Sequence, residues 1–190
     1  MTPAKDLGDR LEKLPELLSE KSFLTSSGIG NEIAFYIFAF EPEHQPIIDN
    51  YLPRMKERLK AGADVHVAEF NLYDLILDIL RTDGLLEKTF EIEAKKGTQG
   101  VGKALAKKVR PEKLVQLIEK RLTEPHDLVF LTGVGAAYPL IRSHTVLNNL
   151  HPVMDRVPVV MFFPGSYDGS ELRLFNTLKD DNYYRAFPLL

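Results

Sequence analysis

The sequence predicts one three-layer α-β-α domain built on a mainly parallel sheet. Two apolar runs, residues 128–132 and 157–163, are rich in Val and Phe, carry no charge and are each followed by a glycine turn. Runs of this kind are typical of strands buried on both faces, as in parallel sheets. A third run, residues 33–40 (IAFYIFAF), has the same character. Because these runs alternate with helical patterns, we expect helices on both faces of the sheet.

Length and composition are those of an ordinary globular domain. A chain of 190 residues with 44% hydrophobic and 27% charged residues predicts a single domain, 1–190. The chain has no cysteine, which excludes disulfides and cysteine-based metal or redox chemistry. Its five histidines lack metal-site spacing. No apolar stretch is long enough for a membrane span, and the start of the chain carries acids rather than a secretory signal, so we expect a cytoplasmic protein.

The first elements are a helix and a buried strand. Leucines recur at helical spacing over residues 4–20, which predicts an amphipathic helix disturbed at Pro15. Residues 26–30 are rich in Ser and Gly and predict a loop. The strand 33–40 follows it.

The next pair repeats this order as a helix and a strand. The apolar spacing of residues 47–59 predicts a helix that is kinked or split near Pro53 and ends at Gly62. Residues 65–70 then predict a second strand.

A region of helices separates this strand from the next one. Asn71 is a suitable N-cap, because its side chain can accept hydrogen bonds from the first free N–H groups of a helix. We expect 97–102 to break the helical pattern and Pro111 to occupy a first helical turn. The predicted helices of this region are 72–80, 85–94, 103–109 and 112–122.

Residues 127–169 predict a β-α-β unit, which we expect to carry the function. The segment 136–155 is long enough for the helical crossover that two parallel strands require. Ligands of open α/β sheets bind at the carboxyl ends of the strands. The polar residues expected there are Thr132, Arg142, Ser143, His144, Asn148, Asn149, Ser166, Tyr167 and Asp168. After this unit, 172–178 predicts an edge strand and 179–190 a polar-aromatic tail.

Residues 97–104 (GTQGVGKA) satisfy the phosphate-loop pattern GxxxxGK, but Ala104 stands where that motif needs Ser or Thr. No buried strand precedes the motif. The strands 128–132 and 157–163 run into Thr-Gly and Pro-Gly instead of a carboxylate that could hold Mg²⁺. We therefore favour a flexible Gly/Lys connection over a nucleotide site.

The Gly133 and Gly135 pair after the third strand has two interpretations. Glycines there could let a ligand approach the backbone, or they could simply permit a tight strand-to-helix turn, which we favour. The neighbouring Ser143 and His144 point in different directions within one helical turn, so they form no catalytic dyad. Helix capping is the favoured role for this segment.

Three further groups of residues could form sites. The carboxylates Glu41, Asp168, Asp180 and Asp181 could hold a metal only if the fold gathers them, and turns or solvated pairs are favoured. The tail 182–187 has the Tyr, Arg and Phe composition of an interface, with docking onto the domain as an equal alternative. The segment 95–121 holds nine Lys/Arg against two Glu; a solvated face is favoured over contact with DNA.

Several long motifs together resemble one protein family. They are GNEI and FYIF at 30–38, NLYDL at 71–75, FLTGVG at 130–135, YP at 138–139, RSH to NNL at 142–150, PGxYDG at 164–169, LRLF at 172–175 and KDDNYYRAF at 179–187. Together they are similar to the BrxB (DUF1788) family of BREX, or bacteriophage exclusion, defence systems. The resemblance covers nearly the whole chain and is weakest over 86–110.

The resemblance implies a cytoplasmic, non-catalytic subunit of a bacterial or archaeal anti-phage complex, without a cofactor or metal. It also implies a sheet like the core of P-loop ATPases but without the phosphate loop, and a PglZ-type partner of the alkaline-phosphatase superfamily, beside other BREX subunits. The expected partner-binding residues are Arg142, His144, Asn148, Tyr167, Asp168, Asp181, Asn182, Tyr183, Tyr184 and Arg185. The alternatives are a degenerate nucleotide-binding protein using 97–103 and a DNA-contacting protein using 95–121.

Overall fold

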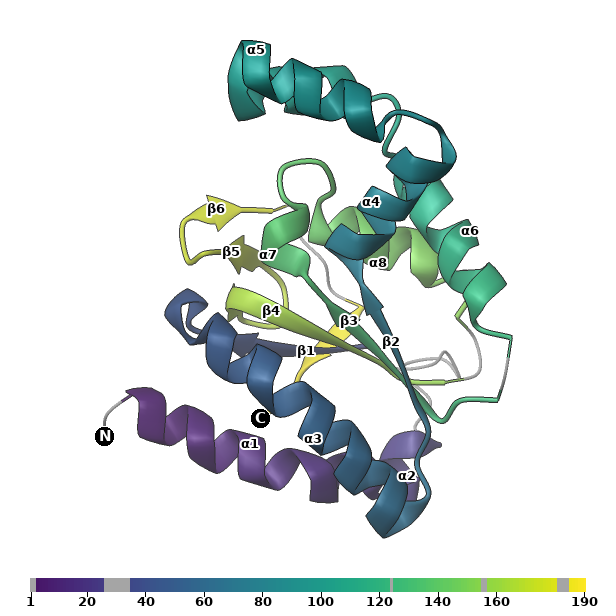
Figure 1. Cartoon of the computed structure of the whole chain (residues 1–190). Helices are drawn as coiled ribbons and strands as arrows, with labels where there is room; N and C mark the ends of the chain where they lie inside the picture. Colours follow the sequence, from purple (N-terminus) through teal and green to yellow (C-terminus); the bar gives the residue numbers. More distant parts are fainter. Residues whose placement is uncertain (1–2, 26–34, 124, 155–156, 181–184) are drawn as a thin grey trace.

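The computed structural model describes residues 3–25, 35–123, 125–154, 157–180 and 185–190 (Figure 1). Within these residues the chain forms a seven-stranded sheet whose main path runs in the order β2-β3-β4-β1-β7, with every pair on that path parallel. These strands are β1 (Phe35–Phe40), β2 (Val67–Asn71), β3 (Leu128–Thr132), β4 (Val159–Tyr167) and β7 (Ala186–Pro188). The predicted parallel sheet is confirmed.

One face of the sheet is covered by α1 (Pro3–Ser19), α2 (Lys21–Leu24) and α3 (Gln45–Ala63). Their apolar side chains pack against Phe38, Phe130 and Phe162 of the strands. A one-turn 3-10 helix, η2 (Pro42–His44), links β1 to α3.

Of these helices, α1 and α3 each continue through an internal proline, so α3 is not split at Pro53. A proline removes its own N–H from the helical ladder. In α3 the neighbouring Leu52 and Met55 are fully buried against the sheet, and this packing keeps the turn helical.

The other face is covered by α4 (Leu72–Thr82), α6 (Pro111–Arg121), α7 (Val134–Ala137) and α8 (Ser143–Leu150). Side chains along β1 alternate between the two faces, with Phe35 and Ile37 toward these helices and Phe38 toward α3. The three-layer arrangement is therefore the predicted one.

The β-α-β unit is confirmed, with Val129 of β3 in register with Val159 of β4. Its crossover, expected to be helical over 136–155, consists of the two helices α7 and α8. The Tyr138–Pro139 peptide bond between them is cis, and Tyr138 has extended backbone angles.

β4 is longer than predicted, because it continues through Pro164 and Gly165 where a turn was expected. Its last residues pair with β5 (Leu172–Leu174), which forms a hairpin with β6 (Leu178–Lys179). Gly165 has φ 152°, and a Cβ there would lie 2.0 Å from the carbonyl oxygen of Arg173. The glycine thus permits close strand pairing, and a hairpin replaces the expected edge strand 172–178.

α5 (Leu86–Leu105) projects beyond the carboxyl edge of the sheet (Figure 1). It contains the motif 97–103, which was expected to be a flexible connection. Only Gly97 leaves helical geometry, at φ 65° and ψ −176°, and the chain is helical again from Thr98. The predicted break of the helical pattern is confirmed at Gly97, where the chain turns back, but the residues after it are helical instead of a flexible connection.

Candidate functional site

The turn after β3 is filled by the side chain of Asn71. Its Oδ1 accepts hydrogen bonds from the backbone N–H groups of Tyr73 (3.0 Å) and Asp74 (3.3 Å), which confirms the predicted N-cap of α4. Gly133 has φ 68°, and a Cβ there would lie 2.0 Å from Asn71 Oδ1. Gly133 therefore makes room for the cap of a neighbouring helix.

Gly135 is covered by the β5–β6 hairpin. A Cβ at this position would lie 2.9 Å from the ring of Phe175 and 3.2 Å from Pro164. The hairpin is held in place by the N–H of Phe175, which donates to the carbonyl of Pro164 at 2.8 Å. Both glycines thus serve close packing of the protein on itself, in agreement with the tight-turn interpretation.

The connection from β1 to α3 is acidic. In P-loop proteins a glycine-rich strand-to-helix connection cradles phosphate with backbone N–H groups. Here that connection is Glu41-Pro42-Glu43-His44. The Glu41 carboxylate accepts a hydrogen bond from the side chain of Asn176 at 2.7 Å, which ties the hairpin turn to β1. The two carboxylates at this connection oppose phosphate binding.

The motif 97–103 lies on α5, away from any strand end, and Gly100 in it has a packing role. A Cβ at Gly100 would lie 2.3 Å from Lys96 Cβ, because the turn at Gly97 brings the two halves of α5 together. A Cβ at Gly102 would lie 4.0 Å from Pro139 Cγ, an ordinary contact distance, so this position does not require glycine.

His144 and Asp180 form a partly buried pair at the start of α8. The His144 Nδ1 lies 2.6 Å from Asp180 Oδ1, and the backbone N–H of His144 donates to Oδ2 at 3.2 Å. Their side chains are only 13% and 10% exposed, whereas Arg142, 3.8 Å from the same carboxylate, is 55% exposed. Asp180 therefore anchors the start of the tail to the positive end of a helix.

Tyr167 anchors the other end of the tail. Its hydroxyl donates to the carbonyl oxygen of Ala186 at 2.9 Å, and burial, with a smaller contribution from the charge of Asp168, raises the pKa of Tyr167 to about 12. Asp168 itself is exposed; N–H groups of Glu171 and Ser170 donate to it and lower its pKa.

Of the predicted partner-binding residues that the structure describes, Arg142, His144 and Asn148 lie on α8 or directly before it. Tyr167 and Asp168 lie at the end of β4, and Arg185 directly precedes β7. His144 and Asn148 are one helical turn apart and share a face. The C-terminal end of α8 also lies near the tail. The ring of His151, which follows α8, packs on Phe35 with the ring centroids 5.1 Å apart, and Phe35 is in register with Ala186 of the tail. Arg142, Asn148 and Arg185 are exposed, and we call them, with the His144–Asp180 pair, the α8–tail surface. The predicted residues Asp181, Asn182, Tyr183 and Tyr184 lie outside the described residues.

The four carboxylates considered for a metal site do not converge, because the described ones contact different groups. Glu41 contacts Asn176, Asp168 its own turn and Asp180 the His144 ring; Asp181 lies outside the described part of the chain. In the described ranges, no three His, Asp or Glu side chains gather at a spacing that could hold a metal ion. None of the described helices is long and apolar enough to cross a membrane.

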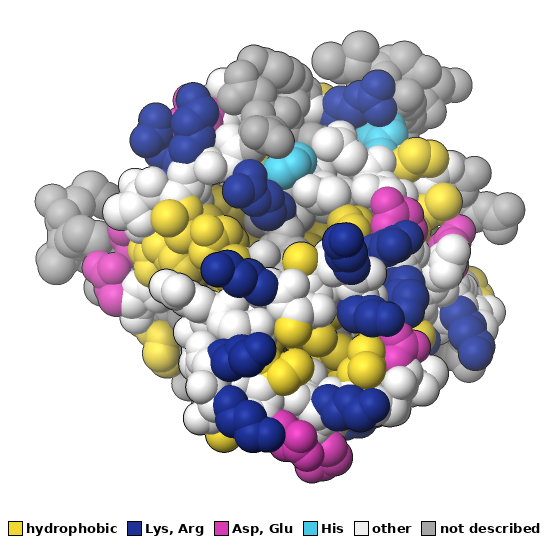
Figure 2. All heavy atoms as spheres, turned by 90° about the horizontal axis from the view of Figure 1, so that it is seen from above, with side chains coloured by type: hydrophobic (Ala, Val, Ile, Leu, Met, Phe, Trp, Pro, Cys, Tyr) yellow, Lys and Arg dark blue, Asp and Glu magenta, His cyan; other side chains and the backbone are white. Residues whose placement is uncertain are grey.

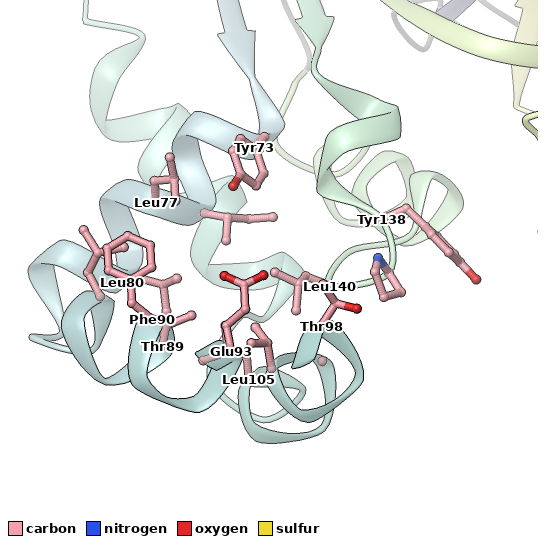
Figure 3. Close-up of a pocket in the computed structure, with 15 residues that line it drawn as sticks. Tyr73, Leu77, Leu80, Thr89, Phe90, Glu93, Thr98, Leu105, Tyr138 and Leu140 are labelled. Atoms are coloured by element: carbon pink, nitrogen blue, oxygen red, sulfur yellow. The ribbon is translucent and has the colours of Figure 1, made fainter. Parts of the chain in front are cut away.

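A second candidate site, which the sequence did not reveal, is an apolar cavity between α4, α5 and residues 138–140 (Figure 3). Its volume is about 200 Å³. Leu77 and Leu80 of α4, Phe90 of α5 and Leu140 contribute apolar walls, and Glu93 and Thr98 add polar atoms. The apolar spacing of α4 was visible in the sequence, but the return of α5 at Gly97 that closes the cavity was not.

Residues 95–108, from just before Gly97 to the turn after α5, form a basic surface beside this cavity. Figure 2, which looks down on this side, shows Lys and Arg side chains spread over the face with exposed hydrophobic groups between them. The lysines there are exposed and make no ion pair with any described residue: Lys95, Lys96, Lys103, Lys107 and Lys108. By contrast, Lys113 and Arg121 of α6 pair with Asp83 and Asp78 at 2.7 Å each.

The fold and the site together define an α/β protein with a mainly parallel sheet. At the carboxyl edge of this sheet, the turn with Gly133 and Gly135 is packed against the side chains of Asn71 and Phe175. A family model described as "BREX protein BrxB" matches residues 68–189. A BREX protein BrxB from Bacillus cereus (strain H3081.97) is 46% identical over 188 residues, 97% of each chain. Another, from Escherichia coli O9:H4 (strain HS), is 35% identical over 182 residues, 95% of this chain and 90% of its own. No solved structure matches the chain. The chain therefore belongs to the BrxB family of BREX proteins.

Proposed function

We propose that the chain is a non-catalytic assembly subunit of a cytoplasmic BREX anti-phage complex and binds a PglZ-type partner. The observation that carries this proposal is the filled carboxyl edge of the sheet. Asn71 and Phe175 occupy the space around Gly133 and Gly135 where α/β proteins commonly hold a ligand. The likeness of the sheet to a P-loop ATPase core stays a prediction, and the acidic connection after β1 supports a role without nucleotide.

The α8–tail surface is the proposed contact with the PglZ-type partner. It combines exposed Arg and Asn side chains with two tail residues that are bonded to the domain, since Asp180 contacts His144 and Ala186 accepts a hydrogen bond from Tyr167. Arg is enriched among interface residues that contribute most to affinity, and truncating such a residue costs about 2 kcal/mol or more. The tail residues Asp181, Asn182, Tyr183 and Tyr184, together with Asp168, belong to the same proposal on the basis of sequence.

The test is co-purification and titration with the PglZ-type partner. The triple variant Arg142→Ala, Asn148→Ala, Arg185→Ala is expected to keep its melting temperature and to lose affinity by about thirtyfold or more. The matched control removes exposed side chains from α3 on the opposite face: Arg54→Ala, Arg58→Ala, Lys60→Ala. Unchanged affinity of the triple variant and of a Tyr183→Ala, Tyr184→Ala variant would rule out this surface.

A nucleotide-binding role is tested separately by thermal stabilisation. A ligand that binds only the folded state raises the melting temperature as its concentration exceeds the Kd. We expect no shift with ATP and Mg²⁺ at millimolar concentration. A shift that Lys103→Ala abolishes would instead support the alternative based on 97–103.

A further inference from the structure

We propose that the α4–α5 cavity and the lysines beside it form a second docking site, which receives an acidic segment of a partner protein anchored by one aromatic side chain. This inference rests on the proposed assembly role but uses a surface separate from the α8–tail surface. An assembly subunit needs two such faces if it is to bridge two other proteins.

The size of the cavity indicates a side chain as its occupant. Sites for drug-sized ligands have volumes of roughly 300–1,000 Å³, whereas an apolar cavity of about 150 Å³ holds a benzene ring. At about 200 Å³ the α4–α5 cavity is matched to one aromatic ring that a larger molecule presents.

The lining specifies the kind of ring. Tyr73 and Phe90 are 40% and 51% exposed, and both border the cavity. The carboxylate of Glu93 and the hydroxyl of Thr98 lie among these apolar groups (Figure 3). An acceptor within an apolar cavity favours a ring that carries an N–H or O–H group, so the anchor is a Trp or Tyr.

The positive charge of the lysines beside the cavity favours acidic residues in the rest of the bound segment. Lys103 follows the cavity-lining Gly102, and Lys107 lies in the turn directly after α5. With no acidic partner among the described residues, they attract a segment rich in Asp and Glu. The first half of α5 carries Glu87 and Glu91, which repel such a segment and so fix its direction.

A protein segment explains both features better than DNA does. Phosphates would contact the lysines but leave an apolar cavity unfilled. An acidic segment with an aromatic anchor uses the lysines and the cavity together.

The experiment uses the full chain and three fluorescein-labelled synthetic peptides. The first has a central Trp flanked by Asp and Glu; the second replaces the Trp by Ala; the third replaces the acids by Lys. Fluorescence anisotropy is expected to show binding of the first peptide, at least about tenfold tighter than of the other two and weakened by salt.

Two variants locate the contact. Thr98→Trp places an indole in the cavity from an exposed position, and its emission reports burial because the chain has no other tryptophan. The charge-reversal variant is Lys103→Glu, Lys107→Glu. Each is expected to weaken binding of the first peptide about tenfold or more, while the control Lys13→Glu, Lys21→Glu, on α1 and α2, leaves it unchanged. Melting temperatures verify that each variant is folded.

Several outcomes would overturn the inference. They are equal affinity for all three peptides, binding that Thr98→Trp leaves intact, and no binding at all. Duplex DNA that binds instead, with loss on charge reversal but not on Thr98→Trp, would identify the lysines as a phosphate contact. The Arg142→Ala, Asn148→Ala, Arg185→Ala variant must still bind the first peptide, so failure of the α8–tail proposal and failure of this one are distinguishable.

Discussion

The hydroxyl of Tyr167 donates a 2.9 Å hydrogen bond to the carbonyl oxygen of Ala186, and this bond joins the end of β4 to the start of β7. The carbonyl belongs to a residue that is itself buried. The tail is thus held to the domain by a side chain that the sequence suggested as a partner contact.

This bond predicts a loss of stability at alkaline pH. The pKa of Tyr167 is raised to about 12 in the folded chain, from an ordinary value of 10.0. Between these values the unfolded chain has lost a proton that the folded chain retains, so the free energy of unfolding falls as pH rises. Burial also raises the pKa of Tyr51, whose hydroxyl donates to Leu11 at 2.6 Å, and adds to the effect.

Tyr167→Phe is expected to cost about 1 kcal/mol at neutral pH through the lost hydrogen bond. It should also reduce the alkaline loss of stability, because the titrating group is gone. Urea unfolding from neutral pH to about pH 11 measures both effects. Parallel pH profiles of the two proteins would contradict the assignment.

Asn71 and Gly133 should be strongly coupled. Asn71→Ala removes a helix cap and is expected to cost about 1 kcal/mol. Gly133→Ala is expected to cost more, about 2–4 kcal/mol, because the residue has positive φ and its new Cβ would overlap Asn71 Oδ1. With Asn71 already truncated, the overlap is absent, so the double variant should cost less than the sum. Chemical unfolding of all four proteins gives the coupling, and additive costs would refute the contact.

The His144–Asp180 pair should hold the tail on the domain. Asp180→Ala removes the acceptor for the backbone N–H and the ring of His144, and we expect a loss of about 1–3 kcal/mol. The tail should also become more sensitive to limited proteolysis than the rest of the domain. His144→Ala should add little in the Asp180→Ala background. Equal cleavage of the tail in wild type and variant would show that the pair does not restrain it.

The glycines of α3 and α5 should respond in opposite directions. A Cβ at Gly62 has nothing within 4 Å, so Gly62→Ala is expected to stabilise α3 by up to about 1 kcal/mol. A Cβ at Gly100 would overlap Lys96, so Gly100→Ala should destabilise the turn of α5 by about 1–3 kcal/mol. Thermal unfolding of each variant measures these changes. Stabilisation by Gly100→Ala would mean that α5 does not turn back as described.

The local elements were predictable because their causes lie within a few residues. The apolar runs of β1 and β3, the cap at Asn71 and the proline at the first turn of α6 all follow from short-range pattern. The return of α5 at Gly97 depends on one backbone angle among several glycines, and the sequence does not say which glycine adopts it.

The candidate sites depended on contacts between distant segments. That Phe175 covers Gly135 requires the pairing of β4 with β5, and that Asp180 meets His144 requires the residue after β6 to lie at the start of α8. Sequence pattern identified Tyr167 as notable but could not show that its hydroxyl points inward to Ala186. The α4–α5 cavity has no sequence signature, since its walls come from three separate parts of the chain.

The position of β1 has a consequence for how the protein is made. Its neighbours in the sheet are β4 and β7, whose paired residues begin at Val159 and Ala186, well over a hundred residues after Phe35. During synthesis this apolar strand leaves the ribosome long before either neighbour exists, and such exposed strands readily pair with one another. We therefore expect β1 to need protection by chaperones, or a low concentration of nascent chains, until β4 has been synthesised. The yield of folded protein should then depend on the rate of translation and on the supply of chaperones.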